Sequence, residues 1–442
     1  LAACTGPGGP GTARTAGPTS MPPPAVGSMV PQVTELTVDA AQSDRGGEGW
    51  QTTLTSERAG TAKLDILPTR AGPLVCLLPY YYSENNSYAV LVALDPADGS
   101  LAWARLISLP DGAAPWWEDY ESAAGNAVTE AADRSDVVVS PDGRYASVIL
   151  RAYVSLTPGE HVSAVAVLDR ASGRAVRTEE IRGLVLGQAL TDDALVIQTS
   201  SLLHPGSETV IAGTDGSDGP GADDVVDTTS TLTAFPLADP QAPPTTGSTP
   251  LWLLGATRDS LLLGASRIDP ACPKGDCLGY RVALATASGR ATGQIDGVYA
   301  VHPNSLLERF TGGETDDAAL TAMARNAPAS TANRDKESSW NRVWAGLGRE
   351  LLDPASGATA DITGLTLSHA PTAGGWITIC RRPAWSKGDK GPTYAPEMVG
   401  WMDAPGPAST EPIMMLSHGG PQKDSSTFTV SLTRTPFTGR TG

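Results

Sequence analysis

Apolar runs along the chain end repeatedly in the same turn pattern. In each copy Leu, Ala and Gly recur at fixed offsets, and three of the four copies carry Asp directly after Leu. The apolar run predicts a strand that ends at Leu, Asp accepts hydrogen bonds from backbone N–H groups two or three residues later, and Gly supplies the positive φ that closes a hairpin. Each copy therefore predicts a turn between two antiparallel strands. The four copies are residues 93–99, 167–173, 283–289 and 351–357.

A second type of turn precedes several of these copies. Residues 137–148 predict a strand, a tight turn at Ser140-Pro141-Asp142-Gly143 and another strand, and residues 191–197 and 258–263 are related. Each repeat then holds two hairpins, that is, four antiparallel strands. Because amphipathic helical windows are almost absent, this pattern predicts an all-β fold, a β-propeller. With weaker copies included, the main turns fall at positions 95, 169, 239, 285, 353 and 403.

The repeat resembles that of a known propeller family. Ala93-Leu94-Asp95, Gly99 and Trp103 resemble the A-L-D-x-x-T-G-x-x-x-W pattern of quinoprotein-like propellers, and residues 140–145 (SPDGRY) resemble a turn of Tol-type and WD propellers. The resemblance covers roughly residues 60–405 and implies architecture only. The Trp occurs after one turn alone and Ala285 replaces one Asp. No quinone-binding ring is recognisable, so we expect no cofactor.

The two ends of the chain are expected to complete the ring. Six turns predict six blades, and the strand Thr427–Leu432 could pair with Trp50–Leu54 to form a seventh four-stranded blade. A blade built from both termini closes the ring and removes exposed sheet edges. The alternatives are an eight-bladed ring and a split β-sandwich. We expect the propeller domain to comprise residues 32–442.

The first residues resemble a membrane-anchoring signal. Leu1-Ala2-Ala3-Cys4 resembles the lipobox of bacterial (actinobacterial-type) lipoproteins. This resemblance implies that a signal peptide is removed upstream and that diacylglycerol on Cys4 anchors the protein. The alternative is an arbitrary chain boundary. Residues 5–31 are mostly Gly, Pro, Ser, Thr and Ala, which predicts that residues 1–31 form a flexible, disordered tether.

Charge and hydropathy exclude two classes of partner. The chain has 48 acidic against 31 basic residues, a net charge of −17, whereas nucleic-acid binding requires Lys and Arg to replace counterions. We therefore expect no nucleic-acid partner. No run approaches the roughly 18 apolar residues of a membrane-spanning helix, so contact with a membrane is expected only through the lipid.

The cysteines and histidines give little support to a metal site. Cys272 and Cys277 enclose a short turn and predict a local disulfide. Cys76 and Cys380 lie in apolar strands, where two buried thiols are favoured over a ring-closing disulfide. Residues 215–227 are rich in Asp but lack calcium-loop spacing, which favours a solvated loop. The five histidines lack paired ligand spacing, so no metal is expected; they are His161, His204, His302, His369 and His418.

Long connections are predicted to gather on one face of the ring. Both hairpin turns of a four-stranded antiparallel blade lie at the same end, so the remaining connections lie at the other. Connections longer than about 12 to 15 residues are often functional. We therefore assign binding to this insertion face. The predicted insertions are Asp111–Arg134, His204–Ser230, Asp269–Gly279, Thr311–Gly346 and Pro383–Pro396.

Aromatic and acidic side chains in these insertions are the candidate ligand contacts. They could stack on a sugar ring and accept its hydroxyl groups, although an aromatic plug at a blade end is the other interpretation. Positive charge is also present on this face, because two of the insertions hold most of its Lys and Arg residues. The candidate residues are Trp116, Trp117, Glu118, Asp119 and Tyr120, with Trp340 and Trp385 from other blades.

These features predict a monomeric, extracytoplasmic lipoprotein on the outer face of the bacterial cell membrane. Its propeller would bind or scaffold an envelope protein or glycan. No G-x-S-x-G, H-E-x-x-H or phosphate-loop motif occurs, which favours a binding module over an enzyme. The alternative is a polysaccharide-active glycoside hydrolase or lyase that uses two carboxylates from different insertions. Carboxyl groups about 5 to 9.5 Å apart in a deep cleft would favour that enzyme.

Overall fold

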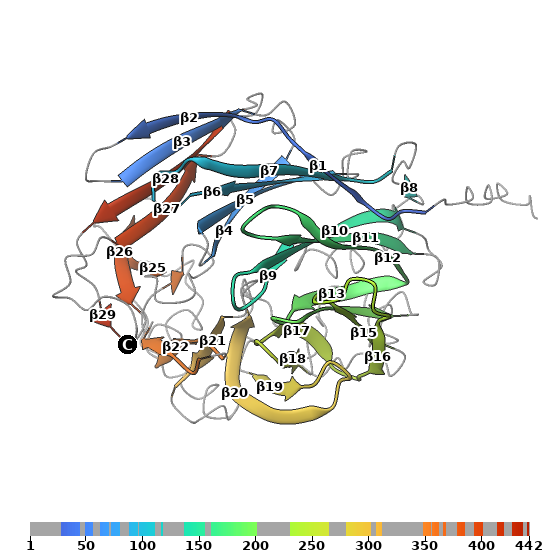
Figure 1. Cartoon of the computed structure of the whole chain (residues 1–442). Helices are drawn as coiled ribbons and strands as arrows, with labels where there is room; N and C mark the ends of the chain where they lie inside the picture. The colour runs from blue at the N-terminus through green and yellow to red at the C-terminus, as the bar shows by residue number, and fades with distance from the viewer. Residues whose placement is uncertain are drawn as a thin grey trace, which may run out of the picture.

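The computed structural model is built of strands arranged around a ring (Figure 1). No helix in the part of the chain it describes is long and apolar enough to cross a membrane. The described residues are 28–44, 49–55, 62–69, 72–79, 88–95, 97–110, 116–117, 137–154, 161–200, 230–264, 280–301, 306–311, 348–354, 356–361, 366–367, 378–384, 393–400, 413–419, 427–435 and 440–441.

The first three sheets each correspond to one blade. Blade 1 has the order β1 (Gln32–Glu35), β7 (Leu101–Ser108), β6 (Tyr88–Leu94), β5 (Gly72–Pro79), β4 (Ala62–Thr69). Blade 2 has the order β12 (Ala175–Arg182), β11 (Val162–Asp169), β10 (Tyr145–Val154), β8 (Trp116–Trp117), and β9 (Val137–Val139) also pairs with β10. Blade 3 has the order β13 (Leu184–Leu190), β14 (Ala194–Ser200), β15 (Thr231–Pro236), β16 (Thr245–Ser248).

The remaining three sheets complete the ring. A seven-stranded sheet has the order β17 (Trp252–Ala256), β18 (Leu261–Gly264), β19 (Tyr280–Ala285), β20 (Ala291–Val301), β21 (Leu307–Phe310), β22 (Arg349–Leu352), β23 (Thr359–Asp361). Blade 6 has the order β24 (Thr366–Leu367), β25 (Thr378–Ala384), β26 (Thr393–Gly400), β29 (Arg440–Thr441). Blade 7 has the order β2 (Asp39–Asp44), β3 (Gly49–Thr55), β28 (Thr427–Thr435), β27 (Ile413–Gly419).

The seven-stranded sheet contains blades 4 and 5, joined through β20. Ile295 and the residues before it pair with β19, Val298 pairs with both β19 and β21, and Ala300 and Val301 pair with β21. Gly297 lies at this change of partner with φ of +78°, a conformation that favours glycine. Six sheets therefore hold seven repeats, and the predicted β-propeller is confirmed. It departs from four separate strands per blade here, where β20 is shared, and in blades 1 and 2, whose sheets each contain five strands.

Ring closure follows the prediction. β28 from the C-terminal part of the chain pairs antiparallel with β3 from the N-terminal part, and Val430 lies opposite Thr52. Leu54, Trp50 and Val430 are buried in one cluster with blade 1 residues. The two ends of the chain thus share a blade and its hydrophobic core.

The repeated turns have the predicted chemistry. The Asp95 carboxylate accepts the Ala97 N–H at 2.7 Å, and the Asp169 carboxylate accepts the Ser172 N–H at 2.9 Å. The glycines that close the turns at 99, 173, 289 and 357 all have positive φ. In the copy without Asp, Thr286 takes over, because its carbonyl accepts the Gly289 N–H at 2.8 Å and its hydroxyl accepts the Arg290 N–H at 3.3 Å. The turn at 403 lies outside the described residues.

The core lies between neighbouring blades. Every residue of β6 is buried, and its side chains alternate between two clusters. Ala89, Leu91 and Ala93 pack toward blade 2, whereas Val90 and Val92 pack toward blade 7. A strand that is covered on both faces needs apolar residues at every position, which explains the continuous apolar runs of the sequence.

The ring has two unlike faces. β13 lies against β9 and β17, so the first strands of these blades are innermost. The turns from first to second strand and from third to fourth strand lie at one end, which we call the turn face. The connections from second to third strand leave at the other end, the insertion face. Residues 383–396 do not form one long connection as predicted, because β25 and β26 occupy both ends and leave only residues 385–392 between them.

Candidate binding site

The structure places two of the predicted ligand contacts at the insertion face. Trp116 and Trp117 form β8, which pairs in parallel with Tyr153 and Val154 of β10. That end of β10 leads into the connection toward β11, and β9 pairs with the other end. The two tryptophans therefore extend the sheet of blade 2. They do not lie in a connection outside the strands, as the sequence had suggested.

Most other predicted site residues lie outside the described residues. Their gathering into one site therefore stays a prediction, as do lipidation at Cys4, the disulfide of Cys272 and Cys277, and the solvated loop at 215–227. Cys76 is a buried thiol, as predicted, and its Sγ lies 3.9 Å from the Leu74 carbonyl oxygen. The ligand contacts concerned are Glu118, Asp119, Tyr120, Trp340 and Trp385.

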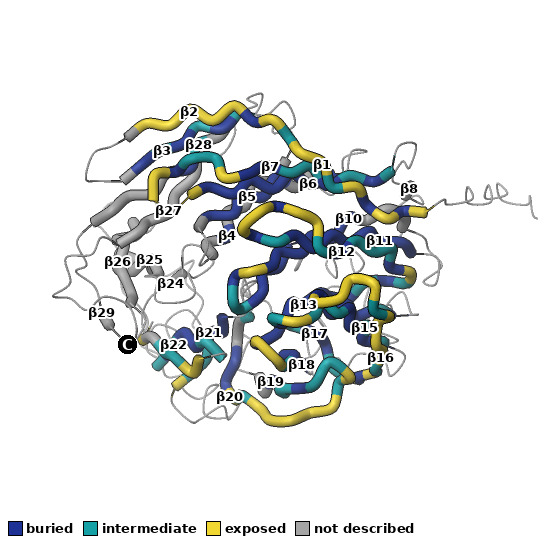
Figure 2. Tube along the Cα trace, viewed as in Figure 1, coloured by how far each residue is buried: buried dark blue, intermediate teal, exposed yellow. Residues whose placement is uncertain are grey.

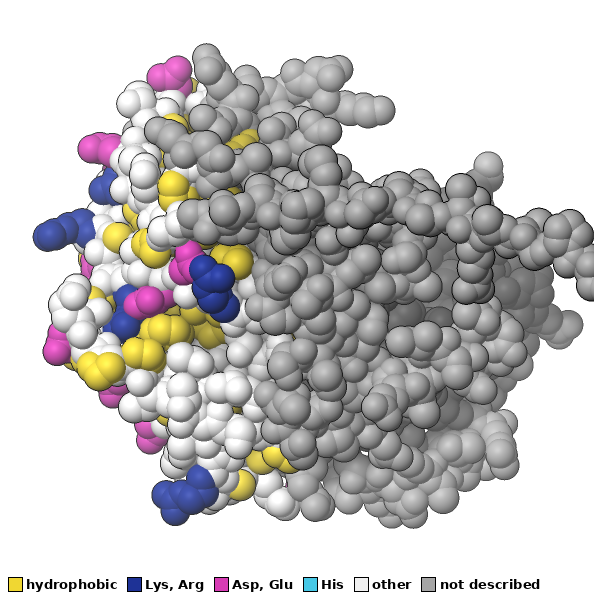
Figure 3. Space-filling view, turned by 90° about the vertical axis from the view of Figure 1, so that its right-hand side faces the viewer, with side chains coloured by type: hydrophobic (Ala, Val, Ile, Leu, Met, Phe, Trp, Pro, Cys, Tyr) yellow, Lys and Arg dark blue, Asp and Glu magenta, His cyan; other side chains and the backbone are white. Residues whose placement is uncertain are grey.

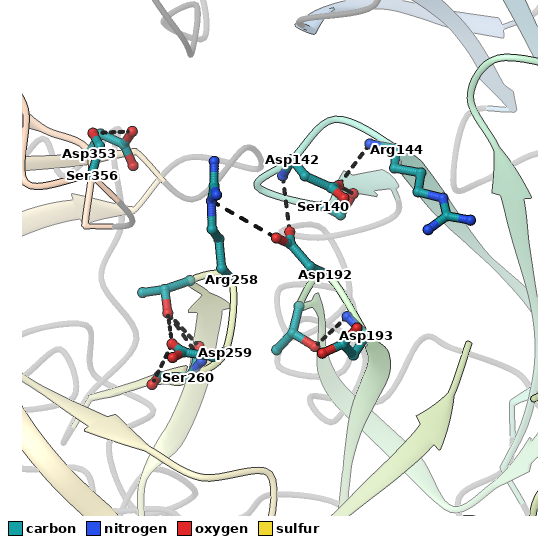
Figure 4. A network of polar contacts seen from close by, with 12 residues as sticks. Ser140, Asp142, Arg144, Asp192, Asp193, Arg258, Asp259, Ser260, Asp353 and Ser356 are labelled. Carbon is teal, nitrogen blue, oxygen red and sulfur yellow. Dashed lines mark hydrogen bonds and ion pairs between the residues drawn. The ribbon is translucent and has the colours of Figure 1, made fainter. Parts of the chain in front are cut away.

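A polar cluster that sequence reasoning missed lies on the turn face. It is formed by the first turns of blades 2, 3 and 4, and we call it the inner-turn cluster (Figure 4). In each turn a hydroxyl residue is followed two positions later by Asp. The Ser140 hydroxyl donates to Asp142 at 2.6 Å, and the Thr257 hydroxyl donates to Asp259 at 3.2 Å. The cluster comprises residues 140–144, 191–193 and 257–260.

Asp192 joins the three turns. Its Oδ1 accepts the backbone N–H of Asp142 at 3.0 Å, and its own N–H donates to the Arg258 carbonyl oxygen at 2.9 Å. Arg258 Nε lies 3.9 Å from Asp192 Oδ2. The Asp192 side chain is 24% exposed and that of Arg258 is 52% exposed, so the guanidinium reaches further into solvent than its partner (Figure 4).

Burial raises the pKa of the Asp192 carboxyl above its ordinary value, and the negative charge of Asp142 adds to the shift. The backbone hydrogen bond from Asp142 and the charge of Arg258 oppose this rise in the pKa without cancelling it. Within the described residues, no group of three His, Cys, Asp or Glu is placed to hold a metal ion. The contacts of Asp192 therefore join the turns of blades 2, 3 and 4.

The sequence contains only part of the information needed to predict the inner-turn cluster. The sequence predicted each turn, because the turn chemistry is local. It could not show that Asp192 and Arg258 meet, because they lie 66 positions apart in different blades. On the side of the molecule shown in Figure 3, basic, acidic and hydrophobic side chains are interspersed over the described residues.

The chain was compared with known proteins. No family model and no curated protein matches it. BamB from Moraxella catarrhalis is similar over 89% of this chain and 100% of its own, with 11% identity and a TM-score of 0.31. The uncharacterised protein lmo1340 from Listeria monocytogenes is similar over 76% of this chain and 80% of its own, with 8% identity and a TM-score of 0.34. At such values the propeller assignment rests on the chain's own sheet order and ring closure.

Proposed function

We propose that this protein is an extracytoplasmic lipoprotein, anchored through Cys4, whose propeller binds an envelope protein or glycan at its insertion face. The observation that carries the proposal is the difference between the two faces. On the turn face, tight turns of a few residues are closed by their own hydrogen bonds. The long connections at residues 201–230, 265–279 and 311–348 join second to third strands and therefore leave from the opposite ends.

A rigid ring that presents long connections is suited to recognition. Binding residues are disproportionately found on loops that a rigid scaffold positions. Blade packing and ring closure supply that scaffold here, and β8 brings the backbone of Trp116 and Trp117 to the insertion face. Trp is enriched among the residues that dominate binding energy, because a large rigid surface is buried at low entropic cost.

The proposal is tested with the full chain on a glycan array and in a pull-down from envelope extract. We expect a ligand that the wild type retains and the Trp116→Ala/Trp117→Ala variant loses, with at least about 2 kcal/mol of lost affinity if both are hot spots. The matched control is Asp259→Asn on the turn face, which should bind like the wild type.

Circular dichroism melting separates binding from folding. If the tryptophans plug the end of blade 2, their loss should lower the free energy of unfolding by about 3 to 5 kcal/mol each, as large core truncations do. A variant that melts and binds like the wild type would remove this site. Release of sugar fragments from a polysaccharide would identify the enzyme considered above instead of a binding module.

A further inference from the structure

Residues 28–44 run as a strap across the outside of three blades. They pass from blade 2 over blade 1 to blade 7, where they continue into β3 (Figure 1). Most of the strap is exposed (Figure 2), but Met29, Pro31 and Val38 are buried and Val33 and Leu36 are partly buried. The strap is therefore attached at several separate points, and these points show how the segment before it reaches the ring.

The first attachment is at Met29. Its side chain is 6% exposed and belongs to the hydrophobic cluster between blades 1 and 2, together with Leu109. Its backbone N–H donates to the Glu180 carboxylate of β12 at 2.7 Å. The predicted tether reached Pro31, so the folded body includes at least the last part of it.

The second attachment is strand pairing. β1 pairs antiparallel with β7, and Val33 packs against the same cluster as Met29. The Leu36 N–H then donates to the Ala104 carbonyl oxygen at 3.2 Å. Val38, 7% exposed, enters the cluster between blades 1 and 7, and β2 pairs with β3.

The direction of the strap shows on which face it begins. β7 starts after the turn at 95–100 on the turn face, and Gln32 lies opposite Ser108 at its far end. β12 likewise starts after the turn at Asp169, and Glu180 lies near its far end. Both contacts place Met29 at the insertion-face end of blades 1 and 2. Residues 1–27 therefore join the body on that side.

We infer that the strap orients the propeller so that its insertion face is turned toward whatever holds the N-terminal segment. This inference rests on the proposed function for the identity of that support, the membrane surface. The partner bound by the insertion face is then a component of the membrane surface or of the layer next to it. A partner in free solution would meet the turn face first.

The test compares two exposed positions at opposite ends of blade 2. Ala171 lies in the turn on the turn face, and Arg182 ends β12 at the insertion face. An eight-residue strand such as β12 spans roughly 26 Å, which separates the two positions well. An azide-bearing residue at either position carries an acceptor dye, and the N-terminal amine carries the donor.

We expect energy transfer to be about twofold more efficient to position 182 than to position 171. When the same amine is coupled instead to a lipid of phosphatidylcholine vesicles, a headgroup quencher should reduce the emission of a dye at 182 more than at 171. Equal values or the reverse order in either measurement would overturn the inference. Since the attachment is chemical, a failure of Cys4 lipidation in cells would overturn the proposed anchor alone.

A strap-release variant supplies the control. Met29→Asp/Val33→Asp places charges in the buried cluster and should reduce the difference in energy-transfer efficiency between positions 182 and 171. Met21→Asp, which lies before the strap, should leave that difference unchanged. If the release variant loses its β-sheet circular dichroism signal, Glu180→Gln is used instead, because it weakens the same attachment without adding a buried charge. This variant should reduce the difference in energy-transfer efficiency by a smaller amount. An unchanged difference in both strap variants would show that the strap does not set the orientation.

Discussion

The indole ring of Trp103 in blade 1 lies directly against Gly173 in the turn of blade 2, where a Cβ would be only 2.6 Å from the ring atom Cδ2. The indole N–H donates to the Arg170 carbonyl oxygen at 2.8 Å. The Arg170 guanidinium lies 5.6 Å from the ring centroid, and burial lowers its pKa to about 10. One aromatic side chain therefore joins two blades, provided that the turn carries glycine.

This relationship predicts that Gly173→Ala is strongly destabilising. The glycine has φ of +65°, which costs an alanine about 1 to 2 kcal/mol, and overlap with the ring adds about 1 to 3 kcal/mol. Gly357→Ala is the matched control, since its φ is +75° but nothing lies within 4 Å of its Cβ position. Denaturant unfolding of both variants measures the difference. Equal losses would show that the Trp103 contact contributes little.

A second prediction concerns Gln198, which is fully buried between blades 3 and 4. Its Nε2 donates to the Leu251 carbonyl at 2.7 Å, and its Oε1 accepts the Leu253 N–H at 2.8 Å. Gln198→Leu leaves both backbone groups without this partner, so we expect a loss of about 1 to 3 kcal/mol for each group in the free energy of unfolding.

The exposed Gln294 of β20 is the control for this substitution. Gln294→Leu should change the free energy of unfolding by no more than about 0.5 kcal/mol, as is usual for surface positions. If Gln198→Leu were equally mild, apolar packing alone would hold blades 3 and 4 together.

The turns and the ring could be predicted because the chemistry of the turns is local. Contacts between residues far apart along the chain could not be predicted. Asp169 and Gly173 predict a turn because the hydrogen bonds that form it span only a few residues. Trp50 stacks on Gly99 much as Trp103 stacks on Gly173, but no A-L-D pattern precedes it, because its blade is assembled from both ends of the chain. Its role appears only once the ring is closed.

The strap and the candidate site also depend on contacts that the sequence alone could not predict. Met29 follows a Gly- and Pro-rich segment, so composition assigned it to the tether although its side chain is buried. For the site, strand order predicted that Trp116 and Trp117 lie at the insertion face, and the structure shows that they form β8, paired with β10 at that end. Which side chains meet there depends on contacts between connections of different blades, and no spacing within one repeat encodes those contacts.

The anchor is tested by changing Cys4. Expressed with the upstream signal peptide that the proposed function requires, the wild type should partition into the detergent phase of a Triton X-114 extraction, because acyl chains contribute about 0.8 kcal/mol per buried CH₂. Cys4→Ala should move the protein to the aqueous phase. Thr5→Ala, one residue further along, should partition like the wild type. A Cys4→Ala protein that stays in detergent would rule out this anchor.

The last prediction is a pH dependence set by Asp192. Its pKa is raised in the folded protein, first by burial and then by Asp142, so the folded state binds this proton more tightly than the unfolded state. The stability it contributes is therefore present below the unfolded pKa of about 4 and is lost as the pH rises through the folded pKa. Asp192→Asn removes the charge and keeps an oxygen for the Asp142 N–H. We expect the variant to be more stable than the wild type at pH 7.

Asp98 supplies a control of the opposite sign. Hydrogen bonds from the side chain and backbone N–H of Ser100 lower its pKa, so its contribution is present at neutral pH and is lost as the pH falls. Asp98→Asn should therefore be less stable than the wild type at pH 7. The differences in the free energy of unfolding between each variant and the wild type should both shrink toward pH 3. Urea unfolding at several pH values measures them. If Asp192→Asn destabilised the protein at pH 7, its ion pair with Arg258 would outweigh the cost of burying the carboxylate.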